Sequence, residues 1–145
     1  VEPTPTPGTG LTAGNYKISV THNGTIYYLT NTVENSQFSS TTDVNAATVW
    51  TLAVSGDGEG YTLADPDGNY LGKADDGSKV SLGATAEVWT WDATNSWLVS
   101  STASTRALAG RYRTDNSQFV FRYYATNPNA TDAEYAFALT FTPVV

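Results

Sequence analysis

The segment YKISVTHNGTIYYL (residues 16–29) joins two runs rich in apolar and β-branched residues through an Asn-Gly turn signal. Such a pattern is typical of a β-hairpin. It returns twice along the chain, as YTLADPDGNYL (61–71) and as WLVSSTASTRAL (97–108). Each copy closes on a leucine, at positions 29, 71 and 108. A hairpin that is repeated three times predicts an all-β domain built from three similar units.

Each hairpin is followed by the signals of two further strands. The third strands of the successive units contain Phe38, Val80 and Phe119. The fourth strands read VWTL (49–52), VWTWD (88–92) and YAFAL (135–139). In the third unit, either Tyr135 or Phe137 is the counterpart of the first tryptophan. Because positions that are large in every unit face a shared core, we expect burial of Leu29, Leu71, Leu108, Trp50 and Trp89.

Three four-stranded units, at about 14–60, 61–96 and 97–142, resemble a β-trefoil, in which six strands close a short barrel and three hairpins cap it. The resemblance implies a single β-trefoil domain over residues 14–145, with the units related by a pseudo-threefold axis. A β-sandwich, which also contains many short strands at this spacing, is the alternative. Residues 1–13 (VEPTPTPGTGLTA) favour an extended backbone and supply little to bury, so we interpret them as a linker between modules.

Composition excludes several classes of function. With 14 acidic and 7 basic residues, the formal net charge is -7, which leaves no cationic surface for nucleic acid. The chain has no cysteine, so thiolate chemistry, disulfides and Cys-ligated metals are excluded. A single histidine is too few for a His-rich metal site. No apolar run approaches the roughly 18 residues of a membrane span. We therefore expect no cofactor, no metal and no membrane insertion.

Two triplets near the fourth strands extend the resemblance to the ricin-type lectins and carbohydrate-binding modules. That family carries Gln-x-Trp at this place, and this chain carries TVW (48–50) and EVW (87–89). The Trp is kept in both units, while the Gln is kept in neither. No unit shows the full set of Asp, aromatic and Asn residues with which the family binds sugar. The resemblance thus implies a lectin-like fold and leaves the position of the site open.

The candidate binding surface lies in the third unit, where polar and aromatic residues mix most densely. Four of the seven basic residues are arginines of this unit, at positions 106, 111, 113 and 122. Aromatic rings would stack on a ligand, guanidinium groups would donate to its oxygens, and carboxylate or amide groups would orient its hydroxyls. The predicted ligand-binding residues are Tyr112, Arg113, Asp115, Asn116, Arg122, Tyr123 and Tyr124. The alternative is a solvated loop without a ligand.

Other conspicuous residues are interpreted as structural. We expect the four tryptophans to pack in the core. Tyr28 and Tyr70 directly precede repeat leucines, so alternation predicts that their rings face outward. The segment DPDGN (65–69) resembles the start of a calcium loop but lacks its closing Glu, and we interpret it as a hairpin turn. His22 occupies the equivalent turn of the first unit, where we expect it to be exposed.

No pair of carboxylates stands out for glycoside cleavage, and a domain of this size offers shallow grooves rather than a deep pocket. We therefore expect no enzyme but a non-catalytic carbohydrate-binding module of a larger secreted or cell-surface, bacterial protein. Its partner would be a glycan or polysaccharide, and the module would be monomeric within its chain. The alternative is a protein-interaction or structural spacer module of an adhesin, which has no sugar site and contacts other surface proteins.

Overall fold

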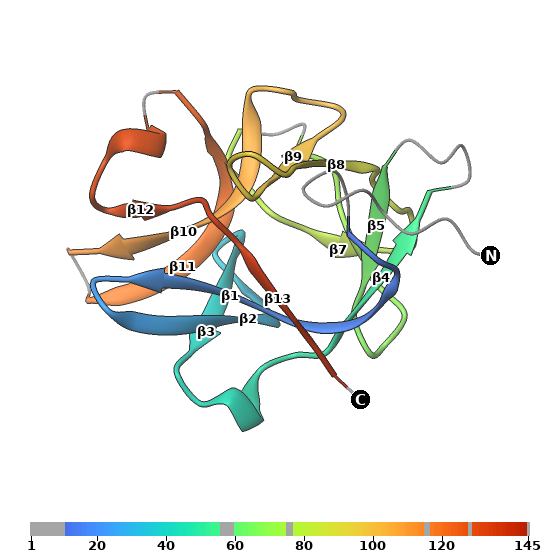
Figure 1. Cartoon of the computed structure of the whole chain (residues 1–145), viewed down its shortest axis with the longest axis horizontal. Coiled ribbons are helices and arrows are strands. Elements are labelled where there is room, and N and C mark those ends of the chain that lie inside the picture. The colour runs from blue at the N-terminus through green and yellow to red at the C-terminus, as the bar shows by residue number, and fades with distance from the viewer. Residues whose placement is uncertain (1–10, 56–59, 75–76, 115–116, 128, 145) are drawn as a thin grey trace.

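The computed structural model describes residues 11–55, 60–74, 77–114, 117–127 and 129–144, which form an all-β structure, as predicted (Figure 1). The strands are β1 (Gly14–His22), β2 (Thr25–Glu34), β3 (Gln37–Thr41), β4 (Trp50–Val54), β5 (Tyr61–Ala64), β6 (Tyr70–Leu71), β7 (Leu82–Gly83), β8 (Trp89–Asp92), β9 (Trp97–Ser100), β10 (Arg106–Arg113), β11 (Gln118–Ala125), β12 (Tyr135–Ala136) and β13 (Thr140–Pro143). Two 3-10 turns, η1 (Val44–Ala46) and η2 (Asn129–Thr131), complete the elements. No helix in this described part is long and apolar enough to cross a membrane.

The strands pair in two series, all antiparallel. In the first series, β1, β2 and β3 pair in order, and β5, β6 and β7 and then β9, β10 and β11 do the same. In the second series, β1 pairs with β4, β4 with β5, β5 with β8, and β8 with β9. The last strand, β13, returns to pair with β1. Segments distant in sequence are therefore joined by backbone hydrogen bonds throughout the domain.

The second and third strands of each unit form a further hairpin, namely β2–β3, β6–β7 and β10–β11. These are the first, second and third hairpins below, and they also bond to one another. β3 of the first hairpin pairs with β11 of the third. The N–H of Val80 donates to the carbonyl of Ser36 at 2.9 Å, and the N–H of Tyr123 donates to the carbonyl of Ser78 at 3.1 Å. The second unit is thereby fastened to both of the others. Figure 1 shows β3 beside β11 at the meeting of these units.

The predicted core is confirmed at the repeat positions. The fully buried residues include Leu29, Leu71, Leu108, Trp50 and Trp89. The other two tryptophans are half-buried: Trp91 packs edge-on against Phe141, and Trp97 packs against Phe137. Trp91 borders the main core, whereas Trp97 borders a second, smaller cluster. All four tryptophans thus contribute to packing.

The predicted fourth strand of the third unit, residues 135–139, is wrong as a continuous element. β12 ends at Ala136 after pairing with β10, and β13 begins only at Thr140. Between them, Phe137 packs into the smaller cluster while Leu139 packs into the main core. The chain passes from one cluster to the other at this point, and that passage interrupts the strand.

The prediction that His22 is exposed is also wrong, since its exposed fraction is 7%. His22 is the last residue of β1, and its ring stacks on Tyr112 with ring centroids 5.9 Å apart and an angle of 14° between the planes. Its Nε2 lies 2.8 Å from the carbonyl oxygen of Ala133, in the segment between β11 and β12. That segment covers the imidazole.

The turn predicted at 65–69 is confirmed. The Oδ1 atom of Asp65 accepts from the N–H groups of Asp67 and Asn69 at 3.0 and 2.9 Å, which is the local bonding that favours Asp in turns. Its Oδ2 accepts from Asn31 at 2.9 Å, so the buried carboxylate is fully occupied by the fold. Within the described ranges, no three His, Cys, Asp or Glu residues gather as metal ligands.

Candidate functional site

Two of the predicted site residues, Tyr123 and Tyr124, face the interior. Their exposed fractions are 0% and 6%. The hydroxyl of Tyr123 donates to the carbonyl of Gly72 at 2.8 Å, and burial raises the pKa of this phenol well above its ordinary value. β11 is covered on both faces, because Tyr123 joins the main core and Tyr124 joins the smaller cluster. The prediction that these rings stack on a ligand is therefore wrong.

Arginines of the third unit hold the fold together. The Nη1 atom of Arg106 donates to the carbonyl of Tyr123 at 2.7 Å. The Nε atom of Arg122, a predicted ligand contact, donates to the carbonyl of Ser78 in the second unit at 3.3 Å. A guanidinium that is bonded to a backbone carbonyl in this way fastens one segment to another. The ligand role predicted for Arg122 competes with this bond.

Arg111 belongs to a further structural cluster. Its Nη2 atom lies 3.1 Å from Oε1 of Glu134, and its guanidinium carbon lies 5.1 Å from the centre of the Tyr135 ring. The ring of Tyr135 packs edge-on against Tyr124 at 4.9 Å. Burial raises the pKa of the Tyr124 phenol, and the nearby positive charges of Arg111 and Arg122 oppose that effect. This cluster holds the segment before β12 against the third hairpin.

The remaining predicted residues do not complete one open surface. Tyr112 is half-buried, stacks on His22 and packs against the main core. Arg113 is half-buried at the end of β10. Asp115 and Asn116 lie outside the described residues. Tyr112 and Arg113 sit near the turn of the third hairpin, while Arg122 lies farther along it, opposite Ala109.

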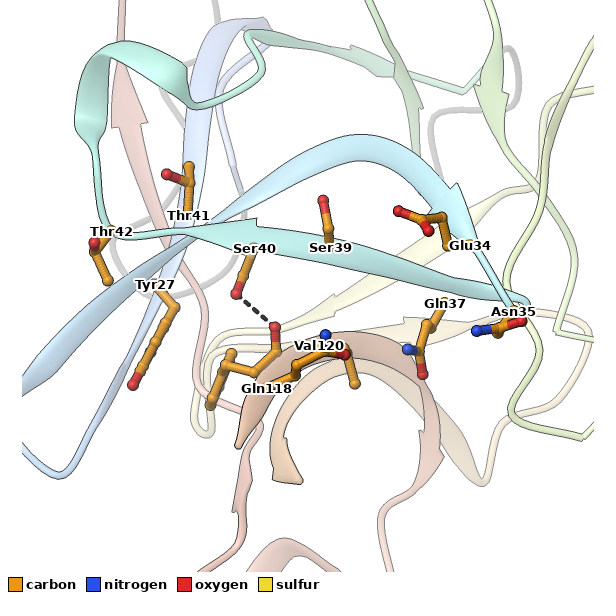
Figure 2. Close-up of a pocket in the computed structure, with 11 residues that line it drawn as sticks. Tyr27, Glu34, Asn35, Gln37, Ser39, Ser40, Thr41, Thr42, Gln118 and Val120 are labelled. Atoms are coloured by element: carbon orange, nitrogen blue, oxygen red, sulfur yellow. Dashed lines mark hydrogen bonds between the residues drawn. The ribbon is translucent and has the colours of Figure 1, made fainter. Parts of the chain in front are cut away.

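A groove of about 520 Å³ lies instead where the first hairpin meets β11 (Figure 2). The lining residues are Tyr27, Glu34, Asn35, Gln37, Ser39, Ser40, Thr41, Thr42, Gln118, Phe119 and Val120. β3 runs along the groove, so the lining residues of this strand and Thr42 after it follow one another along the groove. In Figure 2, Tyr27 and Thr42 lie toward one end of β3, and Glu34, Asn35 and Gln37 lie toward the other.

The two serines in the middle of the groove are hydrogen-bonded within the protein. Ser40 donates from its hydroxyl to the carbonyl of Phe119 at 2.5 Å, which is the dashed line in Figure 2. The hydroxyl of Ser39 lies 2.6 Å from that of Thr30. These bonds accompany the pairing of β3 with β11 and fix the floor between the two ends.

The polar side chains at one end of the groove are uncommitted, which means that they form no hydrogen bond with another described residue. Among the described residues, Glu34, Asn35 and Gln37 have no hydrogen-bond partner for their side chains. Asn35 and Ser36 form the turn of the hairpin with φ values of 54° and 61°, in the left-handed region that Asn tolerates better than most residues. This tight turn presents two amides and a carboxylate at the groove edge, where they are able to bind an external hydroxyl.

The other end of the groove has an aromatic wall. The ring of Tyr27 stacks on Phe119 with centroids 4.0 Å apart and an angle of 5° between the planes. The Phe119 ring packs directly against the backbone of Gly110. A Cβ atom at that position would lie 2.3 Å from the ring, so the packing requires glycine. Tyr27 is half-buried, so one face rests on Phe119 while the rest of the residue borders the groove. A sugar ring packs well on such a supported aromatic surface.

The prediction from sequence missed the groove because it was based on the density of arginine and tyrosine in the third unit. The available signal was the polar run TVENSQ (32–37), which lies between two strand signals and carries no apolar residue after Val33. The other half of the site comes from β11, some 80 positions later, and only the β3–β11 pairing joins them. A single sequence does not reveal that pairing.

A second, smaller groove of about 350 Å³ lies at the second hairpin. Its lining residues are Gly72, Lys73, Ser81, Leu82, Gly83, Ala84 and Thr85. Among the described residues, this lining contains no aromatic ring, no amide side chain and no carboxylate. It therefore has fewer of the groups that orient a hydroxyl-rich ligand than the groove along β3.

Comparisons with known proteins give no family. The chain matches no protein-family model, and the searches of curated proteins and of solved structures found no match.

Proposed function

We propose that this chain is a non-catalytic carbohydrate-binding module that binds a glycan in the groove along β3. One observation carries the proposal: an aromatic wall at Tyr27 and uncommitted polar groups at Glu34, Asn35 and Gln37 line the same groove. Protein sites for neutral hydroxyl-rich ligands combine a flat apolar surface with a few hydrogen-bonding groups that fix orientation.

We further propose that the fold is a β-trefoil. The support is the pairing series β1–β4–β5–β8–β9 together with the return of β13 to β1. The N–H of Leu139, just before β13, donates to the carbonyl of Ser96, just before β9, at 2.9 Å. In a β-trefoil, this bond would join the two ends of the series and so close a ring of six strands. The three hairpins, each bonded to its neighbours, would cap that ring.

The lining of the groove favours binding over catalysis. Glycosidases in general use two carboxylic acids, one on each side of the scissile bond. Glu34 is the one carboxylate among the described residues that line the groove. A module of this kind would act within a larger secreted or cell-surface protein, to which the Thr/Pro-rich linker would connect it. Residues 1–10 of that linker lie outside the described residues.

The test is a glycan array probed with the full chain and with two variants. Asn35→Gly removes an uncommitted amide of the groove while keeping the left-handed turn, since glycine adopts that φ readily. Arg113→Ala removes a residue of the surface predicted from sequence. We expect glycan binding that Asn35→Gly weakens and Arg113→Ala leaves unchanged. The absence of binding to every glycan would overturn the proposal and leave the alternative of a spacer or protein-interaction module.

A further inference from the structure

The geometry of the groove points to a particular class of glycan, and this inference rests on the proposed function. We infer that the groove binds an internal segment of an uncharged, linear oligosaccharide that is about three sugar units long. It does not bind a terminal monosaccharide or an anionic polysaccharide. Three observations lead to this class: the length of the groove, the position of its free polar groups and its charge.

The length follows from the strand that forms the groove. β3 and the residue after it line the groove from Gln37 to Thr42. A strand advances about 3.3 Å per residue, so these five steps span roughly 17 Å, which matches about three linked pyranose rings. A single ring would leave most of this length unfilled.

The free polar groups lie at opposite ends of that length. Asn35 and Gln37 lie at the hairpin end, while Thr42 and the ring of Tyr27 lie at the other (Figure 2). Between them, the hydroxyls of Ser39 and Ser40 are bonded within the protein. A ligand that uses both ends must therefore extend along β3, with its middle unit over a floor that offers few new hydrogen bonds. A linear chain satisfies this requirement.

The charge of the groove selects against anionic glycans. Glu34 is the one charged residue among the described residues that line it, and the whole chain carries a formal charge of -7. No arginine or lysine among the described lining residues offsets a uronate or a sulfate. A carboxylate close to bound anions raises their free energy, and the net negative charge slows their approach. Neutral sugars meet neither obstacle.

The first experiment measures affinity against chain length. Isothermal titration of the full chain would use xylo-, cello- and malto-oligosaccharides of one to six units, with oligogalacturonides of the same lengths as the anionic counterpart. We expect at least one neutral series to bind, with an affinity that rises up to three or four units and then stays constant. The oligogalacturonides should bind at least tenfold more weakly than the neutral series at equal length.

The second experiment tests whether one ligand uses both ends. Asn35→Gly and Thr42→Val each remove one polar group at opposite ends, and both positions are exposed. We expect each variant to bind a trisaccharide about fivefold more weakly, as the loss of one hydrogen bond would cause. A disaccharide that rests on the aromatic end should lose affinity with Thr42→Val alone. Tyr27→Ala extends the test to the ring, and Tyr28→Ala, at the neighbouring position outside the lining, is its matched control.

The outcomes separate the two proposals. Array binding to monosaccharides, branched termini or anionic glycans, with no dependence on length, would overturn this inference and leave the proposed function standing. The same conclusion would follow if only one of the two end variants bound the trisaccharide more weakly. It would also follow if the chain bound glycans on the array but bound no neutral series in the titration. If the full chain bound no glycan on the array, the proposed function itself would be overturned. Circular dichroism of each variant would establish that it is folded.

Discussion

The third hairpin and the groove along β3 have similar chemistry but use it differently. The third hairpin carries arginines and tyrosines in high density, yet Tyr123 is buried and Arg122 is bonded to the backbone of another unit. The groove carries a smaller set, in which Asn35 and Gln37 have no partner in the described structure. The comparison teaches that composition indicates where polar residues are dense. A candidate binding surface is indicated only by which polar side chains lack hydrogen-bond partners within the protein.

The difference has a physical origin. A buried polar group costs free energy unless it is hydrogen-bonded, so a hairpin at the centre of the domain must use its polar groups internally. The third hairpin is central, because β11 pairs with both β10 and β3 and bonds to Ser78 in the second unit. The Asn35 turn lies at the edge of the first hairpin, and its amide is exposed to solvent, so it needs no partner within the protein.

The largest expected effect tests the structural role of the third hairpin. Tyr123→Ala should lower the free energy of unfolding by about 3–5 kcal/mol, since it removes a fully buried ring and leaves a cavity beside Trp89. Urea unfolding followed by tryptophan fluorescence would measure the loss. A variant that kept full stability and lost only glycan binding would return Tyr123 to the binding surface and break the comparison.

The next effect concerns alkaline pH. Burial raises the pKa of Tyr123 and of Tyr124 above the ordinary value of about 10, so the folded state disfavours both phenolates. Their contribution to stability is present below about pH 10 and is lost as the pH rises above it. Each phenol that stays neutral only in the folded state lowers stability by about 1.4 kcal/mol per pH unit in that range.

Unfolding midpoints between pH 9 and pH 12 would measure this loss. Tyr123→Phe should reduce the slope, because it removes one ionisable group while keeping the ring in the core. The groove variant Asn35→Gly should leave the slope unchanged. An unaltered slope in Tyr123→Phe would mean that this phenol ionises equally in the folded and unfolded states, against its burial.

Much of the fold could be predicted from the sequence, because hairpin signals and repeat spacing are local. The burial of Trp50 and Trp89 followed from their equivalent positions in two units and is confirmed. The failures arose where one segment serves two clusters. The strand expected over 135–139 is interrupted between Phe137 and Leu139, and His22 is covered by a segment more than 100 positions later. Neither effect leaves a local signal.

The candidate site could not be predicted in the same way. The density of polar and aromatic residues placed Tyr123 and Tyr124 on a binding surface, but both faces of β11 are covered, so both rings are buried. Whether a polar residue is free depends on partners that only the folded chain brings near, as Ser78 is brought to Arg122. The sequence identified the residue types that suit a sugar, and the structure moved the candidate from the third hairpin to the groove.

The smallest expected effects are those of one substitution in each region, Arg111→Ala and Asn35→Gly. They provide the sharpest comparison because one should change only stability and the other only glycan affinity. Arg111→Ala removes a half-exposed ion pair with Glu134 and a contact over Tyr135, so it should cost at most about 1 kcal/mol of stability while glycan affinity stays unchanged. Asn35→Gly should do the reverse, with stability within about 0.5 kcal/mol of the parent chain and weaker glycan binding, since its amide is uncommitted and glycine keeps the turn. Thermal unfolding and titration with the same oligosaccharide would give both quantities for each variant. If Arg111→Ala weakened the glycan and Asn35→Gly weakened the fold, the binding surface would lie on the third hairpin, as the sequence first indicated.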